Sequence, residues 1–515
     1  METTIRTESG YFDAFFDGMK AITDDDGSTV TIDGRAYRIW WGNYWIRDQI
    51  HMLKAYRFWE PDVRSALDFF LERQTDEGFF YEMIMPPDNC HCEMVDEPCK
   101  YYDKANDKVY IRLENEADIE YMMVEGVYHA WQACGDTEWM VRWLPALEKG
   151  IDYTLSDPKR CDPKTHLVMR TFTIDTWDFT YNEDVMNRRI EPHMPMAIMH
   201  GDNSGAYQAC VLLGRMWEAA SNPGKAAAWG RRASELREKT NEVCFNGAFY
   251  THLVHLGEVP DIGRDEDKRL SLSNAYDINR FLPTHEMAVS IIREYQRRRE
   301  TSGWFAEWFS INPPYPRFAH YKADEYINGC VAPFVAGELA KAAFNHGFER
   351  YGVDILRRVR DIWKEDGEKL AFLYTANREH QGGGPAGWGS AALYSAMIEG
   401  LAGIVDLTKA FEEVRLSPRW AATEETQAEV NAVYAASGAR CGYVWRLTGD
   451  GISVTWDAPT AGRVEFHVLL PQGKSPTGVT CNGRQARFET STIEEGRYVD
   501  FDVIGTSRGK AAIAM

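Results

Sequence analysis

Two carboxylates beside large aromatic rings are the first candidates for chemistry in this sequence. The segment TIDTWDFTYN (173–182) places Asp175 and Asp178 around Trp177. Burial against aromatic rings disfavours the charged form of a carboxyl group, so the group keeps its proton to higher pH. We therefore predict that Asp178 is a general acid whose pKa is raised by Trp177 and Phe179, with Asp175 as its rival. A capped surface turn is the alternative interpretation.

A second segment of this kind is WWGNYWIRDQIH (40–51), where Arg47 and Asp48 follow Trp41 and Tyr44. In the structural interpretation, Asp48 lies in the first turn of a helix, where its charge suits the helix dipole, and Arg47 forms a surface ion pair. In the functional interpretation, the Arg–Asp pair forms hydrogen bonds with sugar hydroxyls between aromatic walls.

A third segment, FAHYKADEYINGCVAPF (318–334), contains Asp324, Glu325 and Asn328 close to several aromatic residues. The two acids suit the N-terminus of a helix, where negative charge is stabilising. They also suit a loop that reaches into the same site as the first two segments.

The fourth segment is YTANREHQGGGPAGWGSAALY (374–394), which contains Glu379, Gly382–Gly384 and Trp388. The three glycines permit tight, positive-φ backbone. The segment lacks the Gly-Lys-Ser/Thr ending and the preceding strand of a phosphate-binding loop. We interpret it as a flexible loop that sets Glu379 opposite a bound ligand.

Helices must position these four segments. Ten stretches between residues 45 and 407 repeat apolar residues at i, i+3, i+4 and i+7. Some are apolar on most faces and others on one face, which predicts inner helices covered by outer ones. We predict a mainly α chain built as an (α/α)6 toroid, which needs twelve helices, with the long loops gathered at one mouth.

The residue pattern changes after about residue 410, where polar and apolar residues alternate between turns rich in Gly, Pro and Asn. This pattern predicts a small antiparallel β-sandwich. We divide the chain into an N-terminal extension with short strands (1–35), a helical barrel (36–410) and the sandwich (411–515). The stretch STVTIDGRAYRIWW predicts a hairpin that leads into the barrel.

The composition limits the class of ligand. A formal net charge of −21 disfavours nucleic acid and anionic membranes as partners, because both favour Lys and Arg. No apolar run approaches the roughly 20 residues of a membrane span, and the first residues do not resemble a signal peptide. We expect a cytoplasmic protein. Its 17 Trp, 25 Tyr and 24 Phe residues fit a partner with apolar C–H faces, such as a small carbohydrate.

One cysteine cluster raises the question of a metal. Cys90, His91, Cys92 and Cys99 lie within ten residues. A Cys-x-Cys spacing is tighter than the usual zinc knuckle, and no second pair follows. We interpret the cluster as a thiol-rich loop and expect neither a metal nor a cofactor.

Taken in order, the four segments resemble the six-hairpin glycosidases, and in particular the trehalase and processing α-glucosidase group. In trehalases a Gly-Trp-Asp-Phe-Ser-Ser segment carries the general acid, and Thr176–Thr180 is similar, which nominates Asp178. The segment Ala323–Pro333 is similar to one that lines the family's sugar pocket. Glu379 matches the family's general base, which precedes a Gly-rich loop and a Gly-Trp motif. The trailing sandwich looks more like those of rhamnosidase-type and disaccharide-phosphorylase relatives.

The resemblance covers roughly residues 36–407 and implies an inverting glycoside hydrolase acting on a short oligosaccharide or glycoside, which we expect to be an α-glycoside. Two carboxyl groups roughly 6.5–9.5 Å apart are needed for inversion. The expected substrate-binding residues are Trp41, Tyr44, Arg47, Asp48, Asp175, Trp177, Asp324, Glu325, Asn328 and Trp388. A disaccharide phosphorylase, a rhamnosidase-type exo-glycosidase and a non-catalytic carbohydrate-binding protein are the alternatives.

Overall fold

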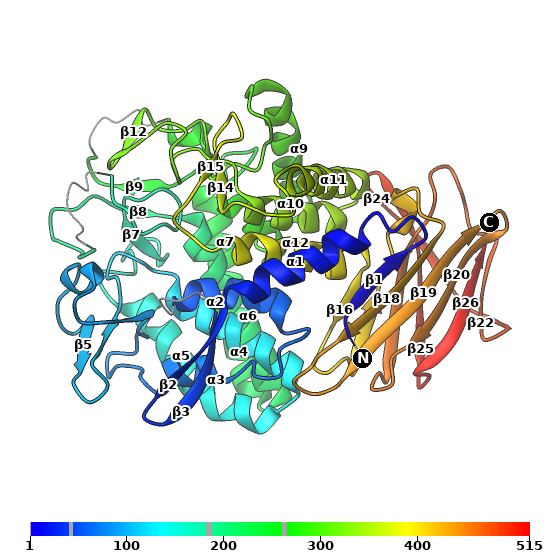
Figure 1. Ribbon diagram of the computed structural model, residues 1–515, viewed down its shortest axis with the longest axis horizontal. Coiled ribbons are helices and arrows are strands. Elements are labelled where there is room, and N and C mark those ends of the chain that lie inside the picture. The colour runs from blue at the N-terminus through cyan, green and yellow to red at the C-terminus, as the bar shows by residue number, and fades with distance from the viewer. Residues whose placement is uncertain (1, 41–44, 182–187, 260–264) are drawn as a thin grey trace.

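A computed structural model describes residues 2–40, 45–181, 188–259 and 265–515 of the chain. Its helices form one body and a β-sandwich lies at the right of Figure 1, with both chain ends on the sandwich side. The α-helices are α1 (Asp13–Asp25), α2 (Ile46–Tyr56), α3 (Ser65–Leu71), α4 (Ile119–Cys134), α5 (Thr137–Ser156), α6 (His200–Ala219), α7 (Pro223–Cys244), α8 (Ser273–Asn279), α9 (His285–Thr301), α10 (Pro333–Asn345), α11 (Glu349–Glu365) and α12 (Ala386–Ser395).

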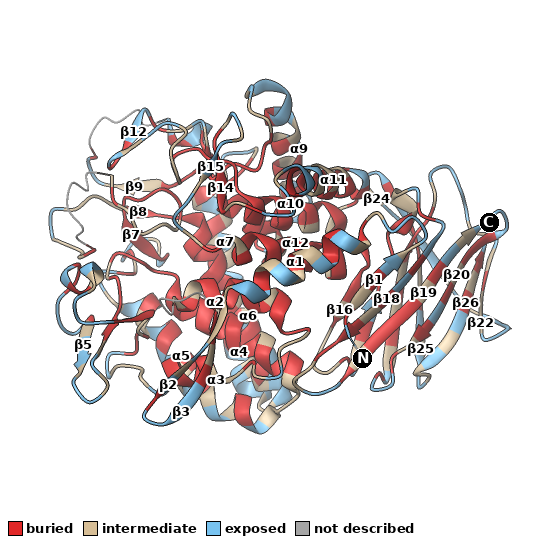
Figure 2. Cartoon of the chain, in the orientation of Figure 1, coloured by how far each residue is buried: buried red, intermediate tan, exposed pale blue. Residues whose placement is uncertain are grey.

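The even-numbered helices form a closed ring. Each of them, from α2 to α12, packs against the next even-numbered helix, and α12 packs against α2. These helices are buried on nearly all faces, as α4 and α12 illustrate. Figure 2 shows this burial: the central helices are red along most of their length.

The odd-numbered helices cover this ring from outside. The helix α5 packs on α4 and α6, α7 on α6, and α11 on α10. The sequence of α11 shows why it lies outside: Ile355, Leu356, Val359 and Trp363 form one buried stripe, and charged residues form the other face. The two kinds of helix agree with the two layers predicted from the sequence.

Ten helices were predicted, whereas the described residues contain twelve α-helices; α1 and α8 were not predicted. The helix α1 lies inside the segment assigned to the N-terminal extension, yet it packs against α12 and α2. The helix α8 has seven residues, of which six are buried, inside a segment interpreted as a long loop. So short a buried helix shows no amphipathic period from which it could be recognised.

The chain is mixed α and β rather than mainly α. Small sheets occupy several segments that were predicted to be loops. These strands are β4 (Met83–Met85), β5 (Lys100–Asp103), β6 (Lys108–Ile111), β7 (Met169–Thr171), β8 (Met196–Ile198), β9 (Val254–Leu256), β10 (Leu270–Ser271), β11 (Ile311–Asn312), β12 (Arg317–Phe318), β13 (Tyr321–Lys322), β14 (Leu373–Tyr374) and β15 (His380–Gln381). The predicted hairpin before α2 is confirmed as β2 (Gly27–Ile32) paired with β3 (Arg35–Trp40).

The sandwich consists of a seven-stranded and a five-stranded sheet, with strand orders β1-β18-β19-β20-β26-β22-β23 and β16-β17-β21-β25-β24. Their bounds are β1 (Thr4–Thr7), β16 (Ile404–Asp406), β17 (Glu413–Leu416), β18 (Gln427–Val433), β19 (Arg440–Thr448), β20 (Gly451–Asp457), β21 (Arg463–Leu469), β22 (Gly478–Cys481), β23 (Arg484–Gln485), β24 (Glu489–Ile493), β25 (Gly496–Ile504) and β26 (Arg508–Ala514). The strand β1 comes from the opposite end of the chain and pairs with β18. Pairing is antiparallel except between β17 and β21.

Candidate active site

A cluster of aromatic rings lies at the N-terminal end of α12. Trp388, the third residue of α12, is parallel to Trp177, with the ring centroids 6.1 Å apart and the planes at 2°. Tyr326 meets Trp177 edge to face at 5.6 Å, and Phe372 lies about 6 Å from Trp177, Tyr326 and Trp388. Three segments singled out in the sequence therefore meet here. Aromatic walls of this kind suit the apolar faces of a sugar ring.

Asp178 belongs to this cluster. Its side chain is 15 % exposed, and its Oδ2 lies 3.4 Å from Nε of Arg188. Burial raises the pKa of Tyr326 well above its usual range, and the charge of Asp178 adds to the rise. The Asp178 carboxylate is therefore held against the Arg188 guanidinium.

The carboxylate of Asp175 is hydrogen-bonded by other residues of the protein. It is 2 % exposed, its Oδ2 accepts a hydrogen bond of 3.0 Å from the backbone N–H of Ser273, and its Oδ1 accepts another from the Ser273 hydroxyl. Its own N–H donates to Nε2 of His252 at 2.8 Å. Burial acts to raise the pKa of Asp175, but His200 and the hydroxyls of Ser271 and Ser273 outweigh it, so the pKa is lowered. These contacts fasten the loop to α8 and favour Asp178 over Asp175 as the proton donor.

The Asp48 carboxyl group is buried in the first turn of α2. It occupies the third position of α2, is 7 % exposed, and forms no side-chain hydrogen bond with another described residue. Burial raises its pKa to about 7, against the lowering effect of Arg47. The charge of Asp48 also makes a small contribution to the raised pKa of Tyr326.

Arg47 was predicted to bind sugar hydroxyls with Asp48, but its guanidinium is engaged elsewhere. Its Nη2 lies 2.9 Å from Oδ1 of Asp118, and the same guanidinium forms a salt bridge with Glu116. Both acids immediately precede α4, so this network ties the start of α2 to the start of α4. Trp41 and Tyr44 from the same predicted segment lie outside the described residues.

Two neighbours of Asp48 were not predicted as site residues. His51, one turn further along α2, stacks on Trp388 with centroids 4.3 Å apart and planes at 15°. Asp26, at the end of α1, accepts a 2.7 Å hydrogen bond from the N–H of Gly387 at the start of α12, and burial raises its pKa to about 6. The signal for His51 was its i, i+3 spacing from Asp48. Asp26 had no comparable signal, because only the fold brings α1 to α12.

Glu379 lies in the hairpin β14–β15, directly before β15. Glu379 is exposed, and its backbone bonds to Thr375 across the turn. Asp324 accepts a 2.7 Å hydrogen bond from the N–H of Ala376. Burial raises the pKa of Asp324, and the charge of Glu379 contributes to the rise. The two carboxylates are therefore neighbours.

The glycines after this hairpin permit close packing. Gly383 has a φ of +113°, and a Cβ there would lie 2.9 Å from the ring of Tyr326. At Gly384 a Cβ would lie 2.5 Å from the ring of Phe372. The Gly-rich loop thus rests directly on two rings of the aromatic cluster, which is a more specific role than the flexibility predicted for it.

The remaining predicted binding residues have structural partners. Asn328 is fully buried, and its amide bonds to the backbone of Tyr315 in both directions, at 2.9 and 3.0 Å. Glu325 accepts a 2.7 Å hydrogen bond from the N–H of Lys322 and closes a turn. Both side chains shape the loop that carries Tyr326.

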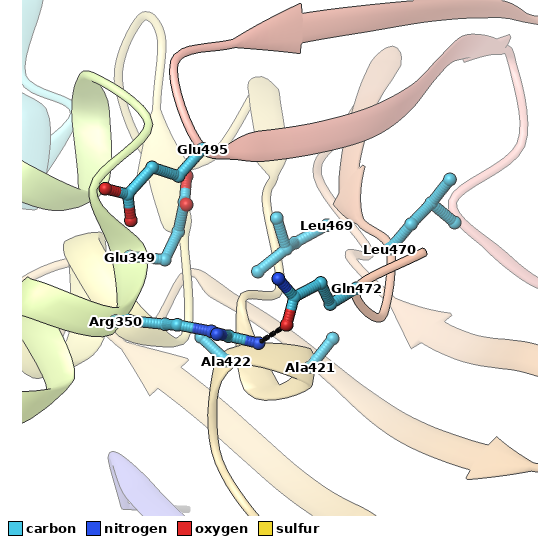
Figure 3. Close-up of a pocket in the computed structure, with 8 residues that line it drawn as sticks. All are labelled: Glu349, Arg350, Ala421, Ala422, Leu469, Leu470, Gln472 and Glu495. Carbon is cyan, nitrogen blue, oxygen red and sulfur yellow. Dashed lines mark hydrogen bonds between the residues drawn. The ribbon is translucent and has the colours of Figure 1, made fainter. Parts of the chain in front are cut away.

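A separate cavity lies between the start of α11 and the sandwich rather than at the aromatic cluster. Figure 3 shows Glu349 and Glu495 on one wall and Arg350 bonded to Gln472 on another. Burial raises the pKa of Glu349 to about 7. We assign this cavity no part in the chemistry of the aromatic site.

The cysteine cluster shows no metal-site geometry. Within the described ranges, no three His, Cys, Asp or Glu side chains are grouped so that they could hold a metal ion. Cys90 is exposed, whereas Cys92 and Cys99 are buried. Among the helices of the described residues, none combines the length and apolarity that a bilayer span needs.

No family model and no curated protein matches this sequence. Solved structures do match it. An α-L-rhamnosidase from Dictyoglumus thermophilum aligns over 100 % of this chain and 51 % of its own, with a TM-score of 0.63 and 10 % identity. A GH78 family rhamnosidase of Bacillus sp. GL1 aligns over 92 % of this chain and 43 % of its own, with a TM-score of 0.62 and 14 % identity.

A GH63 mannosylglycerate hydrolase from Thermus thermophilus aligns over 74 % of this chain and 98 % of its own, with a TM-score of 0.51 and 13 % identity. At these identities the likeness is one of fold. The chain spans about half or less of the length of the two rhamnosidases. The fold is thus one that glycoside hydrolases use, and an activity must be argued from the site itself.

Proposed function

We propose that this chain is a glycoside hydrolase that cleaves a short oligosaccharide or glycoside at the aromatic site between α2 and α12. The observation that carries the proposal is the meeting of Trp177 and Asp178 with Tyr326 and Trp388 from three distant parts of the sequence, beside the helix α2 that carries Asp48. Carboxyl groups in different environments beside aromatic walls are what glycosidic bond cleavage requires. The likeness in fold to rhamnosidases and a mannosylglycerate hydrolase supports it.

We propose the mechanism that the family resemblance implies. Asp178 gives a proton to the leaving oxygen, and Glu379 removes a proton from the attacking water, with inversion at the anomeric carbon. Because Asp178 pairs with Arg188 in the free protein, substrate must displace that contact before the proton is transferred. Glu379 is exposed, so water can reach its carboxylate.

We propose that the closed ring of helices is an (α/α)6 toroid of the six-hairpin type, with residues 36–410 as the main part of the catalytic domain and 411–515 as the main part of the sandwich. The helix α1 packs on the ring from outside the first range, and the strand β16 joins the sandwich from before residue 411. The cyclic packing of α2 to α12 supports the toroid. The N-terminal strand β1 would then be a contribution from the extension to the sandwich.

A rhamnosidase-type exo-glycosidase is the second candidate. The observation in its favour is that the match to the Dictyoglumus thermophilum rhamnosidase extends over the whole chain, sandwich included, whereas the mannosylglycerate hydrolase matches 74 % of it. An α-L-rhamnoside therefore belongs beside α-glucosides among the first substrates tested.

The test is product analysis by NMR on a panel of α- and β-glycosides that includes trehalose, kojibiose, nigerose, isomaltose and α-L-rhamnosides, each with and without phosphate. We expect release of a free sugar without phosphate, with the anomeric configuration inverted in the first product seen. Release that depends on phosphate would identify a phosphorylase. Tight binding without any cleavage would identify a carbohydrate-binding protein and refute the proposal.

A further inference from the structure

A chain of buried polar side chains runs from α8 to the turn that precedes Trp177. Nδ1 of His200, the first residue of α6, lies 2.5 Å from Oδ2 of Asp277 in α8, and Nε2 lies 2.9 Å from the hydroxyl oxygen of Ser271 in β10. The Ser271 hydroxyl is also hydrogen-bonded to Asp175. None of the four linked side chains is more than 2 % exposed. One histidine thus ties Asp175 to two helices of the ring.

The direction of the hydrogen bonds in this chain follows from the single proton of the Ser271 hydroxyl. That proton goes to the carboxylate of Asp175, so the hydroxyl oxygen accepts from an N–H at Nε2 of His200. Nδ1 donates as well, because its partner Asp277 is a carboxylate. Burial acts to lower the pKa of His200, but the charge and the hydrogen bond of Asp277 outweigh it, so the pKa is raised. His200 is therefore a buried cation between two carboxylates.

A second histidine holds the backbone of the same aspartate. The N–H of Asp175 donates to Nε2 of His252 at 2.8 Å, so the proton of this ring lies on Nδ1. Nδ1 lies 2.8 Å from Oε2 of Glu266, whose carboxylate also accepts a 2.7 Å hydrogen bond from the Tyr315 hydroxyl. Burial lowers the pKa of His252, which agrees with an uncharged ring. Asp175 is thus held on two sides by histidines, and each histidine is fixed by its own carboxylate.

The backbone of Asp175 indicates why it is held so firmly. Its φ of +48° lies in the left-handed region, which is unfavourable for a residue with a side chain. Asp175 is the first central residue of a turn that is closed by a 3.1 Å hydrogen bond from the N–H of Trp177 to the carbonyl of Ile174. Strained backbone of this kind persists only where the surrounding contacts enforce it, and it is concentrated at functional sites.

This turn sets the position of the candidate acid. Trp177 ends the turn, its ring is parallel to that of Trp388, and Asp178 follows it directly. The backbone carbonyls of both loop residues are bound as well, that of Trp177 by the buried Arg170 and that of Asp178 by Asn115. A shift of the turn would therefore move an indole ring and a carboxyl group together.

We propose that His200 and His252 are positioning residues for the candidate general acid. Each holds one side of the turn at Asp175, and the turn determines where Trp177 and Asp178 lie. The inference rests on the proposed function in one respect, that Asp178 is the acid. It adds to the site two histidines that act through the turn and not by contact with substrate.

The first test removes one hydroxyl from the chain and leaves both histidines in place. With the substrate that product analysis identifies, Ser271→Ala should lower kcat by ~10-fold. Ser395→Ala is the matched control and should leave kcat unchanged. Ser395 is also a buried hydroxyl between a cation, Lys341, and a carboxylate, Glu399, but it is the last residue of α12, whereas the aromatic cluster lies at the first turn.

The leaving group distinguishes a displaced acid from a general loss of structure. A 2,4-dinitrophenyl group leaves as a weak base and needs little proton donation. The loss of kcat in Ser271→Ala should therefore be smaller on a 2,4-dinitrophenyl glycoside than on a substrate whose leaving group is a sugar. An equal loss on both substrates, or no loss on either, would overturn the proposal.

A measurement without turnover separates this inference from the proposed function. In protein labelled with 5-fluorotryptophan, the fluorine NMR signal of Trp177, assigned with Trp177→Phe, reports the position of the turn. Ser271→Ala should shift this signal and Ser395→Ala should not. A shift in a protein that cleaves no glycoside would uphold the hold on the turn while the glycosidase fails. Hydrolysis with an unshifted signal in Ser271→Ala would uphold the glycosidase and overturn the inference.

His252 provides an independent pair of variants, which also serves if Ser271→Ala does not fold. His252→Met removes the acceptor for the N–H of Asp175, whereas His252→Gln keeps an acceptor oxygen. The Trp177 signal should shift more in His252→Met than in His252→Gln, and kcat should follow the same order. Equal shifts in these two variants, with folding confirmed by circular dichroism, would overturn the proposal.

Discussion

Replacing Asp48 with asparagine removes a titrating group from the first turn of α2 while keeping the size of the side chain. The folded protein holds the pKa of Asp48 at about 7, compared with an ordinary 3.8, chiefly because the group is buried. Between these two values the folded state binds a proton that the unfolded state has released. The free energy of unfolding therefore falls as pH rises from about 4 to about 7, and stays low above that.

The magnitude follows from the same values. Each unit of pKa corresponds to about 1.4 kcal/mol, so a rise from 3.8 to about 7 is a cost of ~4 kcal/mol at pH 8. An entropy of unfolding near ~2.1 cal/mol/K per residue gives about 1 kcal/mol/K for this chain. Asp48→Asn should then raise Tm by ~4 °C at pH 8 and by ~1–2 °C at pH 5.

Differential scanning calorimetry at pH 5, 6, 7 and 8 measures this gain. Asp178→Asn is the control, because its carboxylate pairs with Arg188 and its loss should not stabilise the protein at high pH. An Asp48→Asn gain that is absent, or that does not grow with pH, would refute the reasoning. A gain in stability combined with weaker sugar binding would show that Asp48 is present for function.

Three further changes test other parts of the structure. Lys54→Met removes the cation between two buried carboxylates, Glu125 and Glu338, and should lower the free energy of unfolding by ~3–5 kcal/mol. An unchanged urea midpoint would contradict this. Glu349→Gln should stabilise the protein by up to ~3 kcal/mol at pH 8 but little near pH 4.5. Burial raises the pKa of Glu349 from 4.5 to about 7, so the folded state loses stability as pH rises through that range. A stability difference independent of pH would argue against this reasoning. Gly383→Ala should displace Tyr326 and lower kcat on the substrate that product analysis identifies. The control is Gly382→Ala, whose Cβ meets open space and which should leave kcat unchanged. Equal kcat values for the two variants would disprove the packing role.

Long helices with a clear apolar period were predictable from the sequence. The stripe of α11 and the all-round apolar faces of α12 assigned them to the outer and inner layers. The helix α8 was not predictable, because seven mostly buried residues carry no period. Short strands were predicted for residues 1–35, but the pairing of β1 with β18 was not predictable, because the two strands lie at opposite ends of the chain.

The candidate site was predictable as a set of segments but not as a set of contacts. Trp177 and Trp388 were expected in one site, and the fold stacks them. Arg47 and Asn328 had suitable chemistry for sugar binding, but Asp118 and the Tyr315 backbone occupy their polar atoms. A sequence shows which groups a residue carries, whereas its partners depend on which distant elements pack beside it.

Asp26 was not predicted as a site residue for the same reason. It lies in a segment assigned to the extension, and its link to the site is a single hydrogen bond from the N–H of Gly387. No local pattern relates residues this far apart in the chain. Asp26 becomes a candidate only once α1 is seen to pack on α12.

The most direct test of the central claim is the turnover of Asp178→Asn on the substrate that product analysis identifies, with Asp96→Asn as a control. Asp96 is also an aspartate paired with an arginine, Arg189, but its side chain is 70 % exposed. If Asp178 is the general acid, kcat should fall by roughly 10²–10⁴-fold with a small change in KM, and Asp96→Asn should be unaffected. Full turnover by a folded Asp178→Asn would contradict the account.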